Sequence, residues 1–294
     1  MNKTISKTTA DLGLLSVTVF WGTTFILSKI VLAEISLTRY LSVRLTIAAV
    51  IMLLYALRFR REFTLQALKH GFILGIFLFL SYFFQMWGIS YTTASKAGFI
   101  TGLNVVFVPI FSVLFFGDRP KIASLAGVAF ATLGLFFLSG GDISGLNSGD
   151  WLVFICALVV TFHVILTGRF APRNNIYVLT AVQLTTIAVF SLIFAAFDSN
   201  PGPPADTRII LLMIYLALFG TLFTFLMQTA MQRFTTATRT ALVFSMEPVF
   251  AALFAYIIGG ETMTPGGWMG GGLILCGMII AEIDWKRLLA RVQE

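Results

Sequence analysis

The chain has 294 residues, of which 58% are hydrophobic and 11% are charged. An ordinary soluble domain carries about 25% charged residues, so this chain lacks the polar surface that would cover such an apolar core. The composition therefore excludes a soluble globule and indicates a protein whose solvent is lipid. The net charge of +7 favours a membrane surface over nucleic acid, because the cations lie in short gaps between apolar runs.

Cofactor chemistry finds little support in the sequence. Cys156, Cys276, His70 and His163 lie far apart and form none of the short spacings that hold zinc or iron–sulfur clusters. No Gly-rich loop followed by Lys and Ser or Thr occurs, so an ATP-driven pump would need a separate chain. We therefore expect no metal, no cofactor and no disulfide framework.

Ten apolar runs are long enough to cross a bilayer, which takes a helix of about 20 residues. They begin near Asp11, Thr38, Leu68, Ala94, Lys121, Ser148, Asn174, Thr207, Thr236 and Pro265. The residues left over are too few for an extramembrane domain. The first run is followed by no Ala-x-Ala cleavage signal, so we expect a retained helix and not a signal peptide.

The cations are divided unequally between the two sides that ten alternating spans define. One side receives 15 of the 20, the other receives Arg39, Lys96 and Arg208, and Lys29 and Arg44 fall within spans. Cations near helix ends resist translocation, so the side with 15 is predicted to be cytoplasmic. Both termini are then expected in the cytoplasm.

The sequence repeats itself at a constant spacing of 143 residues, which we call the repeat offset. Residues 91–96 (YTTASK) align with residues 234–239 (FTTATR), and the same offset pairs Gln85 with Gln228 and Asn104 with Glu247. The offset spans five helices, an odd number, so the second copy must enter the membrane from the opposite side. We therefore predict an all-α integral membrane protein whose ten transmembrane helices form two inverted five-helix repeats, residues 1–143 and 144–294.

Inverted repeats characterise secondary transporters, whose substrate site lies near the membrane midplane between the halves. Polar groups at that depth are costly and are therefore candidates for function. Glu247 could bind a substrate ammonium, exchange a proton, or fix helix packing through hydrogen bonds. Asn104 suits amide or carboxylate recognition, or an interhelical hydrogen bond. His163 could carry a proton because its pKa lies near physiological pH, although a packing role is commoner.

The other candidates combine aromatic, hydroxyl and amide groups. Trp21, Thr24 and Phe25 follow helical spacing on one stripe, and Tyr82 lies on the face of Gln85. Each has a packing alternative, and Arg44 is expected to be structural. The predicted substrate site comprises Trp21, Thr24, Phe25, Tyr82, Gln85, Asn104, His163, Gln228 and Glu247, with Glu247 and His163 as candidates for proton coupling.

Several motifs resemble the EamA-type members of the drug/metabolite transporter superfamily. They are residues 20–25 (FWGTTF), Arg44, residues 94–95 (AS), residues 247–249 (EPV) and residues 260–261 (GE). The resemblance covers nearly the whole chain and implies ten helices, an inner-membrane location, and export of amino acids, metabolites or toxic small molecules. Two departures are Asp118, where the family commonly has Glu, and residues 161–163 (TFH), where a second Trp-Gly element is expected.

The predicted function is a secondary active transporter that exports amino acids, related metabolites or drug-like amphipathic solutes by alternating access. The alternative is an intramembrane enzyme acting on a lipid or small molecule, which needs carboxylates, His or Cys around one cavity. A receptor or structural protein is a weaker third option. The expected partners are a small-molecule substrate, protons as a candidate coupling ion, and the lipid bilayer. We expect no nucleic acid, and we expect a monomeric functional unit.

Overall fold

The computed structural model describes residues 6–138, 147–198, 206–260, 262 and 264–282, and this part of the chain is helical without a strand. Its helices are α1 (Lys7–Leu32), α2 (Leu37–Ala56), α3 (Leu65–Ile89), α4 (Ala94–Gly102), α5 (Asn104–Phe116), α6 (Ile122–Leu138), α7 (Ser148–Phe170), α8 (Ile176–Ala196), α9 (Thr207–Ala217), α10 (Thr224–Met231), α11 (Ala237–Phe244), α12 (Glu247–Gly259) and α13 (Pro265–Glu282). The predicted starts agree to within four residues, with the largest difference at α1.

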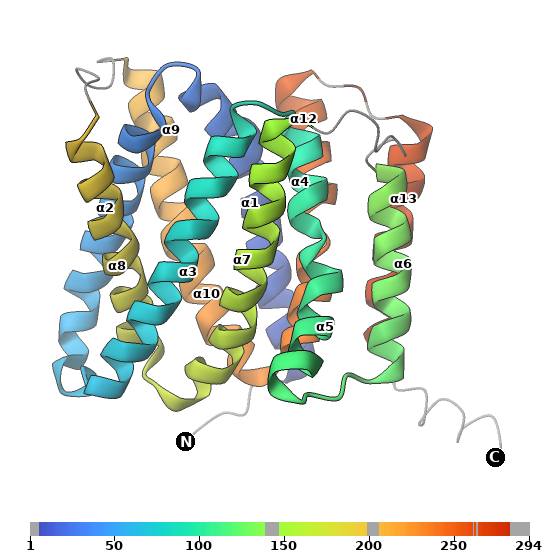
Figure 1. The fold of residues 1–294 in the computed structure, drawn as a ribbon, viewed down its shortest axis with the longest axis horizontal. Coiled ribbons are helices and arrows are strands. Elements are labelled where there is room, and N and C mark those ends of the chain that lie inside the picture. Colours follow the sequence, from blue (N-terminus) through green and yellow to red (C-terminus); the bar gives the residue numbers. More distant parts are fainter. Residues whose placement is uncertain (1–5, 139–146, 199–205, 261, 263, 283–294) are drawn as a thin grey trace.

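The helices run side by side as one bundle (Figure 1). Eight segments of the described chain are long and apolar enough to cross a membrane, and two shorter apolar helices span Ile122–Phe137 and Pro265–Ile280. Large apolar side chains face outward, among them Leu54, Leu114 and Trp268, each at least 60% exposed. Lipid would cover this surface, and the chain is a multi-pass membrane protein.

Two predicted spans are broken, and a third contains a π-helix. A break at Leu103 separates α4 from α5, and a break at Ser245 and Met246 separates α11 from α12. Pro248 fits the first turn of α12 because the backbone N–H that it lacks would have no partner there. Glu247 therefore begins a helix and does not lie inside a continuous one.

A π-helix (Leu218–Phe223) joins α9 to α10. The Thr221 hydroxyl donates to the carbonyl of Leu216, five residues back, at 3.1 Å. A π-bulge of this kind is frequent at functional sites, because it redirects backbone groups away from the regular helical ladder.

Local structure recurs at the repeat offset found in the sequence. Asn104 begins α5 and Glu247 begins α12, and each helix ends at a glycine in the left-handed conformation, Gly117 (φ 67°) and Gly260 (φ 66°). A residue with a Cβ rarely adopts this conformation, which explains both glycines.

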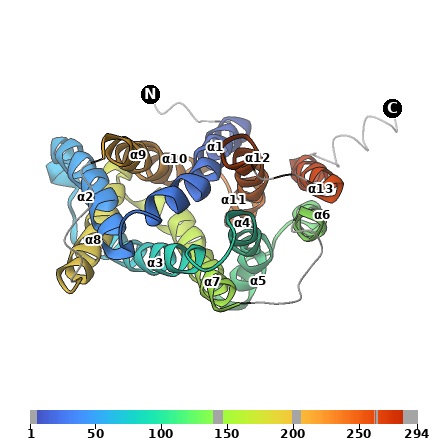
Figure 2. The same cartoon turned by 90° about the horizontal axis from the view of Figure 1, so that it is seen from above.

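The helices that follow, α6 and α13, pack against each other at one edge of the bundle (Figure 2). A Cβ on Gly134 would lie 2.6 Å from the carbonyl oxygen of Gly270, and one on Gly277 would lie 2.6 Å from that of Gly127. The repeat offset relates Gly127 to Gly270 and Gly134 to Gly277, so the same close contact is made twice.

Described cations gather at one end of the bundle. The turn after α2 (Leu57–Glu62) carries Arg58, Arg60 and Arg61, and it lies at the end of the bundle where α1 begins and α13 terminates (Figure 1). The opposite end of the described bundle carries Arg39, Lys96 and Arg208 near helix starts.

Candidate functional site

A cavity of about 50 Å³ lies within the bundle, lined by side chains from α1, α2, α3, α4, α5, α7, α10, α11 and α12. A water molecule needs about 10 to 15 Å³ by this measure, so the cavity has room for a few waters. A solute of amino-acid size would require the cavity to widen. The conformation is therefore nearly closed around the site.

Six of the nine predicted site residues line this cavity: Trp21, Thr24, Tyr82, Gln85, Asn104 and Glu247. The lining also contains residues that the sequence did not single out: Leu78, Ser81, Met86, Thr101, Cys156, Val160, Phe225 and Phe244, as well as Arg44, which was expected to be structural. Ser81 lies one helical turn before Gln85. Thr101 lies three residues before Asn104, a spacing that indicates a shared face.

The two helix breaks bring repeat-related residues to the same cavity. Asn104 and Glu247 are the first residues of α5 and α12, and Thr101 and Phe244 precede them by three residues. The repeat offset relates Asn104 to Glu247 and Thr101 to Phe244. The breaks therefore place equivalent positions of the two halves on one cavity wall.

Glu247 contributes a carboxyl group without a partner among the described residues. Its side chain is 8% exposed and lines the cavity. Within the described chain its carboxylate makes no hydrogen bond or ion pair, and the three ion pairs found there use Asp11, Asp118 and Asp150. Burying an unpaired carboxylate costs several kcal/mol, so this group is a candidate for solute binding.

Arg44 contributes a positive group whose hydrogen bonds go only to neutral oxygens. The acceptors are the hydroxyls of Ser28, Tyr40, Tyr82 and Thr221 and the carbonyl of Gly220. Nε lies 2.9 Å from Thr221 Oγ1, and Nη2 lies 3.0 Å from the Gly220 oxygen. Arg44 is 1% exposed, and no described carboxylate neutralises its charge. The N–H donors of Arg44 therefore have acceptors, but its positive charge has no negative partner among the described residues.

The π-helix is what allows Arg44 to reach this position. Gly220 and Thr221 lie within it and supply two of the oxygens. A Cβ on Gly220 would lie 2.9 Å from Arg44 Nη2 and 2.6 Å from a Thr24 methyl group, so only glycine permits this approach. The Tyr82 hydroxyl accepts a hydrogen bond from Arg44 Nη2 at 3.2 Å, and Tyr82 and Glu247 both line the cavity. The cavity therefore has a positive and a negative pole near one tyrosine.

Aromatic rings close one side of the cavity. The Trp21 ring packs against Phe244 and Phe225, with ring centres 5.0 and 5.5 Å apart, and Tyr82 packs against Phe225 at 5.9 Å. Such rings offer an apolar surface with a preferred edge-to-face geometry. They would accommodate the apolar part of a solute.

The structure places the other three predicted residues outside the lining. Phe25 is 2% exposed and belongs to the apolar core. His163 Nε2 lies 3.1 Å from Oε1 of Gln183, and Gln228 Nε2 donates to Gln232 Oε1 at 2.9 Å. His163 and Gln228 lie in a separate polar region.

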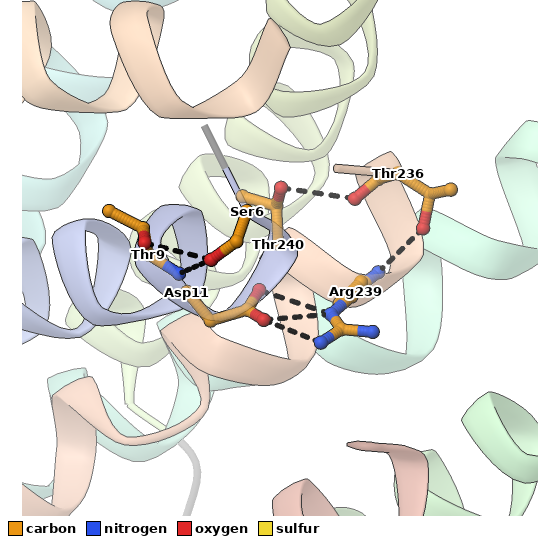
Figure 3. Close-up of polar contacts among 6 residues, drawn as sticks. All are labelled: Ser6, Thr9, Asp11, Thr236, Arg239 and Thr240. Atoms are coloured by element: carbon orange, nitrogen blue, oxygen red, sulfur yellow. Dashed lines mark hydrogen bonds and ion pairs between the residues drawn. The ribbon is translucent and has the colours of Figure 1, made fainter. Parts of the chain in front are cut away.

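Repeat-related ion pairs lie at opposite ends of the bundle. Lys96 pairs with Asp150 at 2.7 Å, and Arg239 pairs with Asp11 at 2.5 Å (Figure 3). The repeat offset relates Lys96 to Arg239. Asp150 also accepts from the Thr92 hydroxyl at 2.7 Å. Lys96 joins the start of α4 to α7, and Arg239 joins the start of α11 to α1.

Metal chemistry gains no support from the described residues, since no three His, Cys, Asp or Glu side chains gather there as a metal site. A helical membrane bundle with a small central cavity, two ionisable groups that lack an ionic partner among the described residues, and an interhelical ion pair at each end fits a solute transporter. The sequence model of the EamA-like transporter family matches twice, over residues 8–140 and 147–282. The chain belongs to this family.

The chain is also similar to proteins that are named as transporters. An uncharacterized transporter of Archaeoglobus fulgidus is 36% identical over 279 residues, covering 95% of this chain and 87% of the relative. The uncharacterized transporter YoaV of Bacillus subtilis is 22% identical, covering 94% and 97%. Human solute carrier family 35 member F6 is 22% identical over 134 residues, covering 38% and 36%. A crystal structure with 20% identity superposes with a TM-score of 0.76 over 98% of this chain and all of the other, which supports the fold.

Proposed function

We propose that this chain is a secondary active transporter of the cell inner membrane that exports small zwitterionic solutes of amino-acid type by alternating access. The observation that carries the proposal is the central cavity. It is lined by Glu247, a carboxylate without a partner among the described residues, and by Arg44, a guanidinium that no described carboxylate neutralises.

The two poles match the charges of an amino acid. The solute ammonium would pair with Glu247, and its carboxylate would lie toward Arg44 and Asn104. Asn104 is 3% exposed and makes no hydrogen bond within the described chain, so its amide is available to a ligand. Complementary charge of this kind gives specificity more than raw affinity. The apolar part of the solute would pack on Trp21 and Phe225.

Alternating access in this proposal comes from two inverted repeats of five helices, residues 1–143 and 144–294. The equivalent breaks before Asn104 and Glu247, the equivalent glycines Gly117 and Gly260, and the two matches to the family model support this division. Rocking one half against the other would open one end while the ion pair at the other end stays closed.

The cations support a cytoplasmic position for the end that carries Arg58, Arg60 and Arg61. Both termini would then be cytoplasmic. The functional unit in this proposal is a monomer, because two inverted halves of one chain can supply a complete path. Glu247 lies in the cavity and His163 does not, so Glu247 is the better candidate for proton coupling, with solute ammonium and proton competing for one carboxylate.

A second candidate function is export of drug-like cations, which would need only Glu247. Flux into proteoliposomes separates the two. We expect phenylalanine, which has both charges, to cross faster than phenylalaninamide, which lacks the carboxylate, and faster than phenylpropionate, which lacks the ammonium. Equal flux of phenylalanine and the amide would favour the cation exporter.

The relatives reported above are named as transporters, which supports transport and not the intramembrane enzyme. Mass spectrometry of the recovered solute tests this point. Transport predicts an unchanged mass, whereas an enzyme would yield a product. Flux no greater than in protein-free liposomes for all three compounds would contradict the proposed function.

A further inference from the structure

A second polar cluster lies where α7, α8 and α10 meet. Its core consists of His163, Gln183, Gln228, Thr229 and Gln232, each no more than 1% exposed. Gln183 bonds His163 and also donates to the Thr229 hydroxyl at 3.1 Å, while Gln232 donates to the carbonyl of Val164 at 3.0 Å. Three helices are thus joined through amides and hydroxyls in a bundle that is otherwise mainly apolar.

Phe225 separates this cluster from the central cavity. Its ring packs against Trp21 and Tyr82 of the cavity, and it also meets the His163 ring edge-to-face with centres 5.8 Å apart. One aromatic side chain therefore stands between two polar regions.

The cluster is incompletely satisfied in this conformation. Four buried atoms in or next to the cluster lack a hydrogen-bond partner among the described residues: His163 Nδ1, Gln228 Oε1 and the hydroxyls of Thr167 and Thr180. Thr167 lies one turn beyond His163 on α7, and Thr180 lies one turn before Gln183 on α8. Buried polar atoms are normally paired, so a group of unpaired ones points to a ligand that binds in another conformation.

The repeat relates this cluster to the cavity. At the repeat offset, Thr167 corresponds to Thr24 and Gln228 corresponds to Gln85. Phe225 corresponds to Tyr82. Thr24, Gln85 and Tyr82 all line the central cavity. Inverted repeats place equivalent residues toward opposite faces of the membrane, so the cluster is the counterpart of the cavity on the cytoplasmic side.

We propose that this cluster is a second solute-binding site, on the cytoplasmic half of the path, which opens when α7, α8 and α10 separate and which Phe225 divides from the central cavity. It rests on the proposed function and extends it. The groups there are amides, hydroxyls and an imidazole, without the carboxylate and guanidinium of the cavity. The site would therefore hold the polar end of the same zwitterionic solute by hydrogen bonds, and more weakly than the cavity does. For an exporter it is the entry site.

Thiol labelling in inverted membrane vesicles tests the proposal. Thr167→Cys and Thr180→Cys place a thiol in the cluster on two different helices, and labelled peptides are identified by mass spectrometry, so the native cysteines can remain. Ala181→Cys is the matched control, because Ala181 is adjacent to Thr180, equally buried and part of the apolar core. Asn147→Cys, at the opposite end, reports vesicles of the wrong orientation.

If an open state is populated at about 1 to 10%, an impermeant reagent should label the two cluster cysteines about tenfold faster than Ala181→Cys. Saturating phenylalanine should slow this labelling, because the solute occupies the site. Equal rates at all three positions, with transport intact, would overturn the second site and leave the proposed function standing. Fast labelling without protection would show an opening that does not bind solute, and would also overturn the proposal.

Thiol labelling and solute flux distinguish failure of the second site from failure of the proposed function. If the cluster cysteines label as expected but the parent protein shows no flux, the proposed function is refuted and the opening at this end is not. Because one cysteine variant can fail to fold, thermal unfolding of each is compared with that of the parent. Phe225→Leu, which narrows the partition, should raise labelling of Thr167→Cys in right-side-out vesicles, where the reagent reaches the cluster only through the cavity, and an unchanged rate there would contradict the role of Phe225.

Discussion

The two halves of the chain share their backbone features but differ in the charges that they place inside. Each half has a broken span, a left-handed glycine and, at equivalent positions, a cation that pairs with an aspartate of the other half. Yet Asn104 in the first half corresponds to Glu247 in the second, and Arg44 corresponds to Ile187. The shared features form the backbone framework of the bundle. The positions that differ supply the two charged groups at the cavity, Glu247 and Arg44.

The ion pairs at the two ends differ as well. The Asp150 carboxylate is 2% exposed, whereas Asp11 is 13% exposed and receives two nitrogens of Arg239. Lys96 and Arg239 are both partly exposed, at 27% and 19%, so the pairs differ mainly in how deeply the carboxylate is buried. Disturbing a pair costs more where its charge has less solvent. We therefore expect the Lys96–Asp150 pair to cost more to break than the Arg239–Asp11 pair.

The largest stability effect is expected at the position where the halves differ most. Arg44→Met removes the donor to five oxygens and should lower the free energy of unfolding by about 3 kcal/mol or more. The control is Ile187→Met at the equivalent position, which conserves volume and should cost less than about 1.5 kcal/mol. Thermal unfolding in detergent measures both. Equal losses would contradict a special role for Arg44.

The ion pairs give an intermediate effect. Asp150→Asn should cost about 2 to 3 kcal/mol because it leaves Lys96 beside a buried neutral group, whereas Asp11→Asn should cost less than about 1 kcal/mol. Denaturant titration of the two variants in the same detergent compares them directly. A larger loss for Asp11→Asn would reverse the order of the two ion pairs.

The smallest loss of stability is expected for substitutions of the two left-handed glycines, and this loss should be the same in both halves. Gly117→Ala and Gly260→Ala each force a Cβ into the left-handed region and should cost about 1 to 2 kcal/mol. Gly98→Ala is the control, because its Cβ would meet atoms no closer than 3.5 Å within a helix. Unequal losses at Gly117 and Gly260 would show that the two turns are not equivalent.

Much of this framework could be predicted from the sequence, because apolar length and the repeat offset are visible in one chain. The breaks at Leu103 and Met246 and the π-helix are not, since they depend on packing between helices. Phe225 and Phe244 could not be distinguished among 30 Phe. Arg44 was expected to be structural, and its place at the cavity could not be predicted because its five acceptors come from segments far apart in the chain.

The sequence also could not show which polar residues within the spans face the cavity. His163 and Gln228 gave the same signal as Asn104, a polar group within an apolar span. The structure pairs His163 with Gln183 and Gln228 with Gln232, while Asn104 stays unpaired within the described chain at the cavity. Whether a polar side chain faces a neighbour or a cavity depends on helix rotation, which neither composition nor spacing determines.

The most direct test of the central claim is phenylalanine flux in proteoliposomes that carry Glu247→Gln, with Glu247→Asp as the matched control. The glutamine keeps size and hydrogen bonding but removes the charge that would pair with the solute ammonium. Losing a buried charge pair costs about 2 kcal/mol or more, so flux at low solute concentration should fall about 30-fold or more, while the aspartate variant retains part of it. Parental flux and KM in a folded Glu247→Gln variant would contradict the account.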